Sequence, residues 1–593
     1  MENELRQRAM VHLQAAQAAA RAGQLPAAIA EYRAAAALRP DEPEIHFELA
    51  NALRVSGQFA DAIAAYREAI RLRPDYADAL LNCGIALANS GRRGEAHDVW
   101  QAVLELNPND IDALNNLASL CRSAGKIGEA IDYCRRALAI DANHVGIVNT
   151  LGSAYDQQGD LDQAVACYRR ALQLAPHSIF VRSNLLLALT YQQALSPGEV
   201  YDEHREWNRL FAEPLRAEIQ PHTNDRSPDR VLRVGYLSPD FRQHAVSFFL
   251  EPILQHHDRG QVEVFCYSGV ARPDAVTARI RSYGHAWREM VGVRDAAVAE
   301  MIRQDRIDIL IELSGHTSGN RLLIFARKPA PIQVAFLGYL NTTGLDVVDY
   351  RMTDAWADPP GMTDPVYSEK IVRLPRCGWC FHPFEEAPPV APAPHEKNGY
   401  VTFGSFNKLS KLSAAVIEAW ATLLKNTPGT RLLLKWGSLA DESTRQRFFR
   451  LFAEQGVEAE RIELASGTPS MAQHLGTYGR IDLGLDTFPY NGATTTCDAL
   501  WMGIPVVTLA GNTHAGRIGV SLLHAIGLED LIAQTPEQYV HIATALARDP
   551  KRLSELRGGM RARVAGSALR EPLSLTRAVE AAYRQMWHAW CMR

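Results

Sequence analysis

Three consecutive threonines, Thr494–Thr496, follow the turn-forming pair Asn491 and Gly492 and lead into a helix-like stretch. The first turn of a helix presents free backbone N–H groups and a partial positive charge, which together favour a bound phosphate. Thr494 and Thr495 add hydroxyl donors at this point. Ordinary capping of a helix explains one threonine but not three in a row. We therefore predict that this segment binds phosphate groups.

A lysine in a second segment, "GSFNKLSK", has matching chemistry. Lys411 stands five residues after Phe406, which closes an apolar, strand-like run. A diphosphate leaving group needs a cluster of donors because negative charge develops on it as the bond breaks. We predict that Lys411 acts with Thr494 and Thr495 on such a group. We also predict that Asn407, in the same segment as Lys411, contacts the molecule that carries the diphosphate.

The elements that position these residues alternate between strands and helices. From residue 231 onward, short apolar runs alternate with helix-like segments, which predicts parallel sheets with helices on both faces. A proline-rich bridge, residues 383–394, separates two such halves, and we expect two Rossmann-like lobes with a cleft between them. Ligands of such sheets bind beyond the carboxyl ends of the strands. Six polar loops follow strands, so we expect them to converge on that edge.

The first third of the chain is a repeat with a period of 34 residues. One column of this repeat is made of Gly23, Gly57, Gly91, Gly125 and Gly159. Five residues further on, each repeat has an alanine, which lets two helices approach closely. The period resembles that of the tetratricopeptide repeat, whose helical pairs stack into a superhelix with a concave, peptide-binding face.

Amide side chains recur on the first helix of several repeats, at Asn82, Asn116 and Asn184. An amide offers both a donor and an acceptor, which suits a peptide backbone. We predict that these residues bind the acceptor on the concave face; an ordinary place on the helix surface is the alternative.

The bulk composition excludes some classes of partner. A net charge of −5 gives no footprint for nucleic acid or an acidic membrane, and no run of eighteen apolar residues is present. Nine cysteines lack a pairing pattern, and the lone C-x-x-C at Cys377 and Cys380 has no second pair at zinc-ribbon spacing. We expect a cytoplasmic protein without a metal or another cofactor.

Several motifs together resemble the tetratricopeptide-containing protein O-glycosyltransferases, the family of O-GlcNAc transferase and SPINDLY. They are "DFRQHAVSFF", "ELSGHTSGNR", "FGSFNKLSKLS" and "LDTFPYNGATTTCDALWMGIPVVTLAG". The resemblance implies a GT-B fold and inverting, metal-independent transfer of a sugar from a nucleotide sugar to Ser/Thr hydroxyls of proteins. In this family the second lobe holds most of the donor.

The resemblance also implies roles for individual residues of the second lobe. Lys411 would steady the donor diphosphate, Thr494, Thr495 and Asp498 would bind the donor, and His474 would lie near the nucleobase.

In the first lobe, the resemblance places His244 near the reaction centre as a candidate base, and His316 and Thr317 beside the sugar. Where O-GlcNAc transferase has a histidine before its threonine pair, this chain has Ala493. The motifs are closer to those of SPINDLY, and the loss of the histidine favours GDP-fucose over UDP-GlcNAc as the donor.

We therefore predict an all-α tetratricopeptide superhelix followed by an α/β GT-B fold. The expected boundaries are residues 1–192 for the repeats, 193–229 for a linker, 230–390 for the first lobe and 391–593 for the donor-binding lobe with a closing helix. Two alternatives remain: a repeat scaffold whose catalytic half has lost activity, and a GT-B enzyme with a non-protein acceptor.

Overall fold

The computed structural model describes residues 2–593 and consists of two compact units. The first unit ends at Ala154 and the second begins at Tyr155. The last part of the repeat region therefore belongs to the same unit as both sheets.

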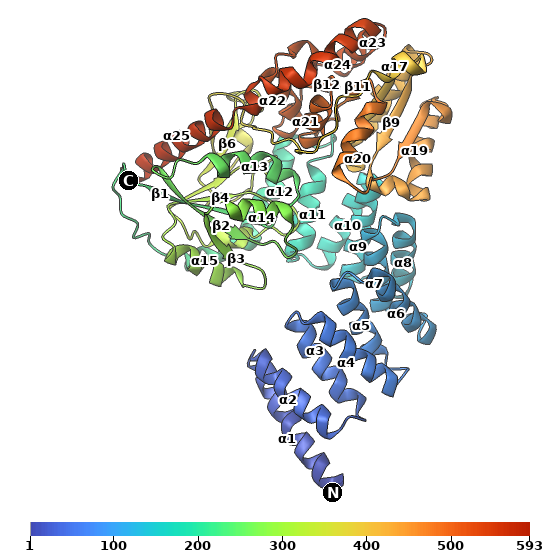
Figure 1. Ribbon diagram of the computed structural model, residues 1–593, viewed down its shortest axis with the longest axis vertical. Helices are drawn as coiled ribbons and strands as arrows, with labels where there is room; N and C mark the ends of the chain where they lie inside the picture. Colours follow the sequence, from blue (N-terminus) through green and yellow to red (C-terminus); the bar gives the residue numbers. More distant parts are fainter. Residues whose placement is uncertain (1) are drawn as a thin grey trace. The chain divides into compact units, whose positions relative to one another are not determined.

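The repeat region is built from antiparallel helical pairs (Figure 1). Its helices are α1 (Glu2–Arg21), α2 (Leu25–Leu38), α3 (Pro43–Val55), α4 (Phe59–Leu72), α5 (Ala77–Asn89), α6 (Arg93–Leu106), α7 (Ile111–Ser123), α8 (Ile127–Ile140), α9 (Val145–Gln158), α10 (Leu161–Leu174) and α11 (Ile179–Leu189). The five glycines of the repeat column lie at the turns within these pairs, with φ between 73° and 86°. The alanines five residues on are fully buried. Both features confirm the helical repeat, because only glycine adopts such a φ without strain.

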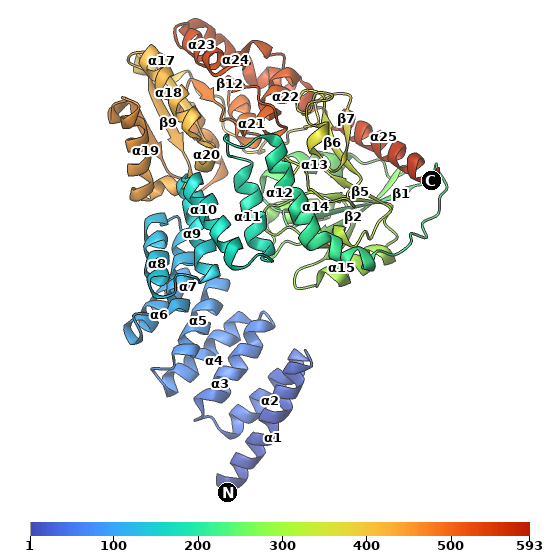
Figure 2. The ribbon, with the colours of Figure 1, turned by 180° about the vertical axis from the view of Figure 1, so that it is seen from behind.

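Helix α12 (Pro197–Trp207) connects the repeats to the first lobe (Figure 2). A capping box at Ser196 and Glu199 starts it. Its neutral His204 donates from Nδ1 to the Val200 carbonyl at 2.7 Å, and Nε2 accepts from the Tyr339 hydroxyl at 2.8 Å. The helix is thereby tied to the loop after strand β5.

The first lobe is a seven-stranded parallel sheet with the order β3-β2-β1-β4-β5-β6-β7. Its strands are β1 (Leu232–Ser238), β2 (Val262–Ser268), β3 (Ala286–Glu289), β4 (Ile309–Glu312), β5 (Ile332–Ala335), β6 (Tyr350–Asp354) and β7 (Lys370–Leu374). Its helices are α13 (Ala245–His256), α14 (Ala275–Ser282), α15 (Asp295–Gln304) and α16 (Leu322–Ala326).

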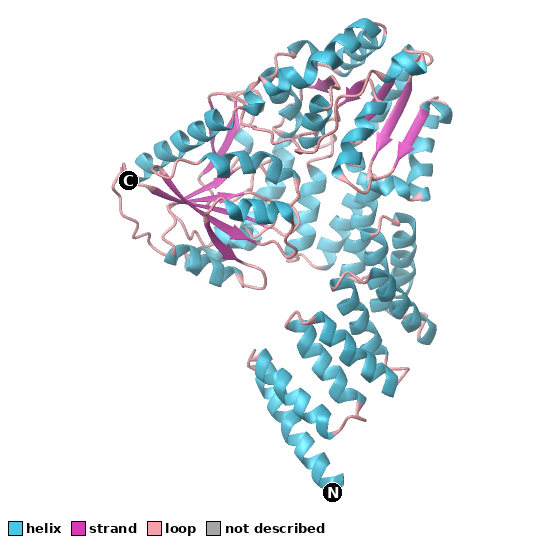
Figure 3. Cartoon of the chain, in the orientation of Figure 1, coloured by secondary structure: helices cyan, strands magenta, loops and turns pink. Residues whose placement is uncertain are grey.

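The second lobe is a six-stranded parallel sheet with the order β10-β9-β8-β11-β12-β13 (Figure 3). Its strands are β8 (Thr402–Ser405), β9 (Arg431–Lys435), β10 (Ile462–Ala465), β11 (Leu483–Leu485), β12 (Val506–Leu509) and β13 (Ile532–Ala533). Its helices are α17 (Pro394–Asn398), α18 (Ala414–Asn426), α19 (Glu442–Glu454), α20 (Met471–Gly476), α21 (Thr494–Trp501), α22 (Ile518–Ala525), α23 (Pro536–Ala547) and α24 (Pro550–Ala565). Two doubly wound lobes after a helical repeat are the predicted fold class.

The last helix, α25 (Pro572–Cys591), returns to the first lobe and packs against α13 and strands β5 and β7. The hydroxyls of Tyr583 and Tyr236 are 3.0 Å apart, and Glu580 pairs with His257 at 3.0 Å. The sequence assigned this helix to the donor-binding lobe, whereas these contacts complete the core of the first lobe.

Within residues 2–593, none of the helices combines the length and apolar composition that a membrane crossing requires.

Candidate active site

The strand order reverses at two places, between β1 and β4 in the first sheet and between β8 and β11 in the second. Ligands of open α/β sheets bind at such switch points. Loops that follow β1, β5, β8 and β11 line a cavity of about 230 Å³. Five of the predicted residues line it together: His244, Asn407, Lys411, Thr494 and Thr495.

A buried carboxylate fixes the shape of the loop after β11. Asp486 accepts hydrogen bonds from the N–H of Gly492 at 2.7 Å and from the Thr508 hydroxyl at 2.8 Å. A Cβ on Gly492 would lie 2.4 Å from the Thr495 hydroxyl oxygen, so the loop has no room for a side chain there. The start of α21 is therefore held in place before a ligand arrives.

The three threonines have three different roles. The Thr496 hydroxyl donates back to the Gly492 carbonyl at 3.1 Å, and the Thr495 hydroxyl donates to the Asn407 amide oxygen at 3.0 Å. The Thr494 hydroxyl is buried and has no hydrogen-bond partner within residues 2–593. Helix α21 begins at Thr494 and its N-cap is Ala493, so no side chain caps the first turn. Thr494 and the free N–H groups of that turn are thus available to an anion.

Lys411 faces this helix terminus from the loop after β8. Its Nζ donates to the Asn491 carbonyl at 2.8 Å and lies 4.4 Å from the centre of the Tyr490 ring. Burial lowers the pKa of Lys411 to about 8, and the Asp486 carboxylate opposes that shift. An ammonium group has three donors, so Lys411 retains N–H groups for a ligand.

The end of the repeat region supports the same loop. Asp156 at the end of α9 pairs with Lys408 at 2.7 Å, and Lys408 lies over the Tyr191 ring at 5.1 Å. The Tyr191 ring in turn meets the Tyr490 ring edge-on at 4.9 Å. Residues of the last repeats therefore contact both the loop that carries Lys408 and Lys411 and the loop that carries Tyr490.

His244 is the N-cap of α13, and 38% of its side chain is exposed. Its Nδ1 accepts from the Val246 N–H at 3.3 Å and lies 3.6 Å from an Asp240 oxygen. Burial lowers the pKa of His244, so the imidazole is neutral at pH 7. With Nδ1 as an acceptor, the proton of the neutral ring lies on Nε2.

Two predicted first-lobe residues do not line the cavity. His316 is buried in an aromatic cluster with His204, Trp207 and Tyr339, and its Nε2 bonds to the Thr343 carbonyl at 2.8 Å. The Thr317 hydroxyl donates to a neighbouring carbonyl at 2.7 Å. Their contact with the sugar stays a prediction.

Two predicted second-lobe residues, His474 and Asp498, do not line the cavity. His474 Nδ1 is 2.6 Å from the ammonium of Lys435. Burial, the larger cause, and the Lys435 charge, the smaller one, lower the pKa of His474 to about 4. Asp498 on α21 is buried without a side-chain hydrogen bond or ion pair in the described chain, and burial raises its pKa to about 7. A buried carboxyl without a partner is costly, so Asp498 is suited to a ligand hydroxyl.

The predicted amides on the repeats are all half-buried: Asn82 on α5, Asn116 on α7 and Asn184 on α11. Their use in acceptor binding stays a prediction.

Other cavity residues were not singled out from the sequence, because aromatic and aliphatic residues carry no local signal of a site. The apolar wall of the cavity is made of Val246, Phe249, Leu337, Leu340, Trp379, Trp436 and Tyr490. Leu337 has a φ of 62°, a conformation that costs an L-residue about 1–2 kcal/mol. The adjacent Gly338 has no room for a Cβ, which would lie 1.6 Å from the Leu313 carbonyl oxygen.

Within residues 2–593, no three His, Cys, Asp or Glu side chains are grouped so that they could hold a metal ion.

Two doubly wound lobes, with residues of both lining one cavity at their switch points, define a GT-B glycosyltransferase architecture. The family model for glycosyl transferase family 41 matches residues 215–381 and 395–577, and the chain belongs to this family. Tetratricopeptide repeat models match residues 17–54, 50–91 and 111–177.

Plant proteins are among the similar sequences. A protein of Hordeum vulgare named as a probable UDP-N-acetylglucosamine–peptide N-acetylglucosaminyltransferase SPINDLY is 44% identical over 420 residues, which cover 70% of this chain and 44% of that protein. An Arabidopsis thaliana protein named SEC carries the same probable enzyme name. It is 33% identical to this chain, and the match covers 61% of this chain and 37% of that protein. The chain thus spans less than half of these plant relatives.

Among solved structures, a mutant of the O-GlcNAc transferase of Thermobaculum terrenum superposes with a TM-score of 0.81. It is 38% identical, and the match covers 87% of this chain and 98% of that one.

Proposed function

We propose that the chain transfers a sugar from a nucleotide sugar to Ser/Thr hydroxyls of proteins, with inversion at the anomeric carbon. The observation that carries this proposal is the buried, unpartnered hydroxyl of Thr494 at the start of α21, in a cavity that it shares with Lys411. A diphosphate there accepts hydrogen bonds from Thr494, from the first turn of α21 and from Lys411. The names of the plant relatives support a peptide acceptor.

The leaving group determines what this cavity must do. Charge builds on the diphosphate as the glycosidic bond breaks, and preorganised donors stabilise that charge most where water is excluded. Lys411 and the positive end of α21 supply such donors, and we propose that the reaction proceeds without a metal ion. Transfer that is unchanged after dialysis against EDTA is the expected result.

For His244, we propose a contact with the reacting hydroxyl or the sugar. A neutral ring is able to accept a proton, but because Nδ1 is engaged with the Val246 N–H, the ring proton is assigned to Nε2. A role as general base therefore requires exchange of the ring proton, whereas a hydrogen bond donated from Nε2 does not. Retention of more than a tenth of the activity by His244→Gln would identify His244 as a hydrogen-bonding rather than a basic group.

The donor is the finer part of the proposal. Ala493, the N-cap of α21, lines the cavity and offers no polar contact to a sugar. The neighbouring wall is apolar, and it accommodates the methyl group of a 6-deoxy sugar as well as that of an N-acetyl group. We retain GDP-fucose as the proposed donor on the ground of Ala493; the names of the relatives favour UDP-GlcNAc.

We further propose that the acceptor protein binds the concave face of the repeats through Asn82, Asn116 and Asn184. All nine cysteines are free thiols in the described chain, which fits a reducing compartment such as the cytoplasm. Two other functions compete with this one: an inactive scaffold, which would bind no nucleotide sugar, and an enzyme that would transfer the sugar to a non-protein acceptor.

The deciding experiment is a thermal shift of the full chain with UDP, GDP, UDP-GlcNAc and GDP-fucose, followed by transfer of radiolabelled sugar to a protein extract. A ligand at a hundred times its Kd adds about 2.7 kcal/mol to the stability of the native state. UDP binding at least tenfold tighter than GDP, a difference of about 1.4 kcal/mol, would assign UDP-GlcNAc instead. The absence of a shift with all four ligands would leave the scaffold as the better explanation.

A further inference from the structure

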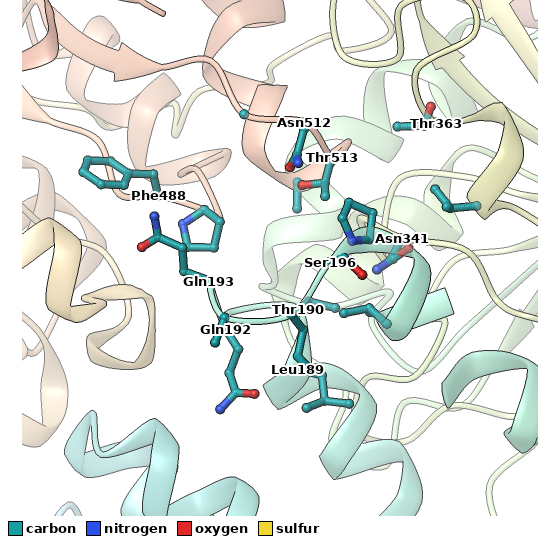
Figure 4. A pocket seen from close by; sticks show the side chains of 18 of the residues that line it. Leu189, Thr190, Gln192, Gln193, Ser196, Asn341, Thr363, Phe488, Asn512 and Thr513 are labelled. Atoms are coloured by element: carbon teal, nitrogen blue, oxygen red, sulfur yellow. The ribbon is translucent and has the colours of Figure 1, made fainter. Parts of the chain in front are cut away.

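A second cavity, of about 580 Å³, lies in the same unit next to the candidate active site (Figure 4). Its wall comes from the loop between α11 and α12, from the first lobe, from Phe488 and Pro489 in the loop after β11, and from the loop after β12. Its volume falls within the range of about 300–1,000 Å³ that is usual for ligand sites. None of the functions considered above uses this cavity, which we call the neutral cleft.

The chemistry of the neutral cleft differs from that of the donor cavity. No lining residue in the described chain carries a charge. Four amide side chains line the cleft. Gln192 donates to the Asp162 carboxylate at 3.4 Å, and the other three, which come from three different parts of the wall, keep their N–H groups free within the described residues. Gln193 and Asn512 are exposed without a side-chain partner within residues 2–593, and Asn341 uses only its oxygen, which accepts from the Thr342 N–H at 2.8 Å. In Figure 4, Gln193 and Ser196 belong to one loop, Asn341 lies beside Ser196, and Asn512 lies across from that loop.

These features select a ligand class. A cleft without charge does not compensate the desolvation of a phosphate, a carboxylate or an ammonium group. Amides that offer both donors and acceptors match the N–H and C=O groups of an extended peptide backbone. The two aromatic residues of the wall, Phe488 and Tyr367, are only 3% and 8% exposed, so neither presents a ring face on which a sugar would stack.

The position of the cleft connects it to the donor cavity. Leu340 and Tyr490 line the donor cavity, whereas their chain neighbours Asn341 and Pro489 line the neutral cleft. The two cavities are therefore separated by the thickness of one stretch of chain. An extended peptide advances about 3.3–3.4 Å per residue, so a few residues bridge that distance.

We propose that the neutral cleft binds an uncharged stretch of the acceptor peptide that flanks the modified Ser or Thr. This proposal rests on the proposed function, because it requires a peptide acceptor. It predicts that Lys or Glu is disfavoured at those flanking positions, whatever the repeats bind further along the acceptor.

The test introduces a charge without changing the shape of a side chain. Asn512→Asp places a carboxylate in the cleft, Gln193→Glu does so from the opposite part of the wall, and Asn398→Asp, on the exposed α17, is the matched control. The probes are synthetic 13-residue peptides with a central Ser or Thr and neutral flanks, and versions with a single Lys or Glu at each flanking position. Donor hydrolysis without peptide serves as the internal reference for each variant.

We expect wild type and Asn398→Asp to prefer the neutral peptides at the same positions. At those positions, Asn512→Asp should raise the ratio of kcat/KM for Lys over Glu peptides at least tenfold. An unchanged ratio at every position in both Asn512→Asp and Gln193→Glu, with normal melting curves, overturns the cleft proposal but not the proposed function. Failure of wild type to modify any peptide despite donor hydrolysis overturns the peptide acceptor, and the cleft proposal with it.

Discussion

The pH dependence of donor use tests the role of Lys411 directly. Burial lowers the pKa of Lys411 from 10.5 to about 8, so its ammonium form is lost as the pH rises through about 8. If this ammonium group binds the donor diphosphate, the neutral amine loses both the charge and one donor. We expect kcat/KM for the donor to be flat below about pH 7, to reach about half of that value near pH 8 and to fall further above it.

The size of the effect follows from that pKa. At pH 9 about one-tenth of Lys411 is still protonated, so kcat/KM falls about tenfold, with a further tenfold loss for each added pH unit. A bound diphosphate favours the ammonium form and raises the pKa of Lys411 in the complex. The alkaline fall in kcat should therefore begin at a higher pH than the fall in kcat/KM.

The assay measures donor hydrolysis between pH 6 and 10 at constant ionic strength, with the donor far below KM and again at saturation. Lys411→Arg is the control, because a guanidinium stays charged over this range. Its activity will be lower, since its geometry differs, but its alkaline fall should disappear. A wild-type profile that is flat to pH 9.5, or an equal fall in Lys411→Arg, would refute the reasoning.

Three further outcomes are expected. Lys411→Ala should reduce transfer by about 10²–10³, as loss of one preorganised donor does, with an unchanged melting curve; activity within a few-fold of wild type would contradict the assignment. Deletion of residues 1–124 should weaken transfer to protein acceptors far more than donor hydrolysis, because the Asp156 contact with the Lys411 loop is retained; equal losses would indicate a folding role for the array. Asp358→Ala should destabilise the second unit by about 1.5–3 kcal/mol in urea melts, because the buried His514 ring and the Thr363 hydroxyl lose their hydrogen bonds to the Asp358 carboxylate. The control Asp364→Ala breaks a more exposed pair and should cost no more than about 1 kcal/mol.

The repeat and the two lobes were predictable from the sequence because their signals are local. The glycine column predicted turns with positive φ, and all five glycines have it. The apolar run that begins at residue 231 appears as strand β1, and the Ser413 hydroxyl caps α18 by accepting from the Val416 N–H at 3.3 Å.

The strands that the sequence did not reveal are short, and the placement of the last helix depends on residues far apart in the chain. Strand β13 has two residues and β3 has four, too few for a periodic pattern. The assignment of α25 to the first lobe depends on contacts such as that between Tyr236 and Tyr583, which are 347 residues apart in the chain. No local pattern carries that information.

For the site, the sequence identified residues with strong chemistry, and the structure places five of them in one cavity. It gave no means of separating His244, which lines the cavity, from His316, which lies in an aromatic cluster. Both histidines follow strands. His316 is a core residue because Trp207 and His204, from a different part of the chain, pack against it.

The return of α25 to the first lobe has a consequence for synthesis on the ribosome. Strand β1 begins at Leu232, but the Trp587 side chain that donates to the Ser227 carbonyl, at the edge of the same lobe, is translated about 350 residues later. At about 5–20 residues per second, the nascent first lobe waits roughly 20–70 s for its last helix. During that time α13 exposes the apolar surface that α25 later covers, while the second lobe is synthesised and folds beside it. The nascent chain is therefore a candidate for chaperone binding at α13, and removal of the last twenty residues should expose the same surface permanently.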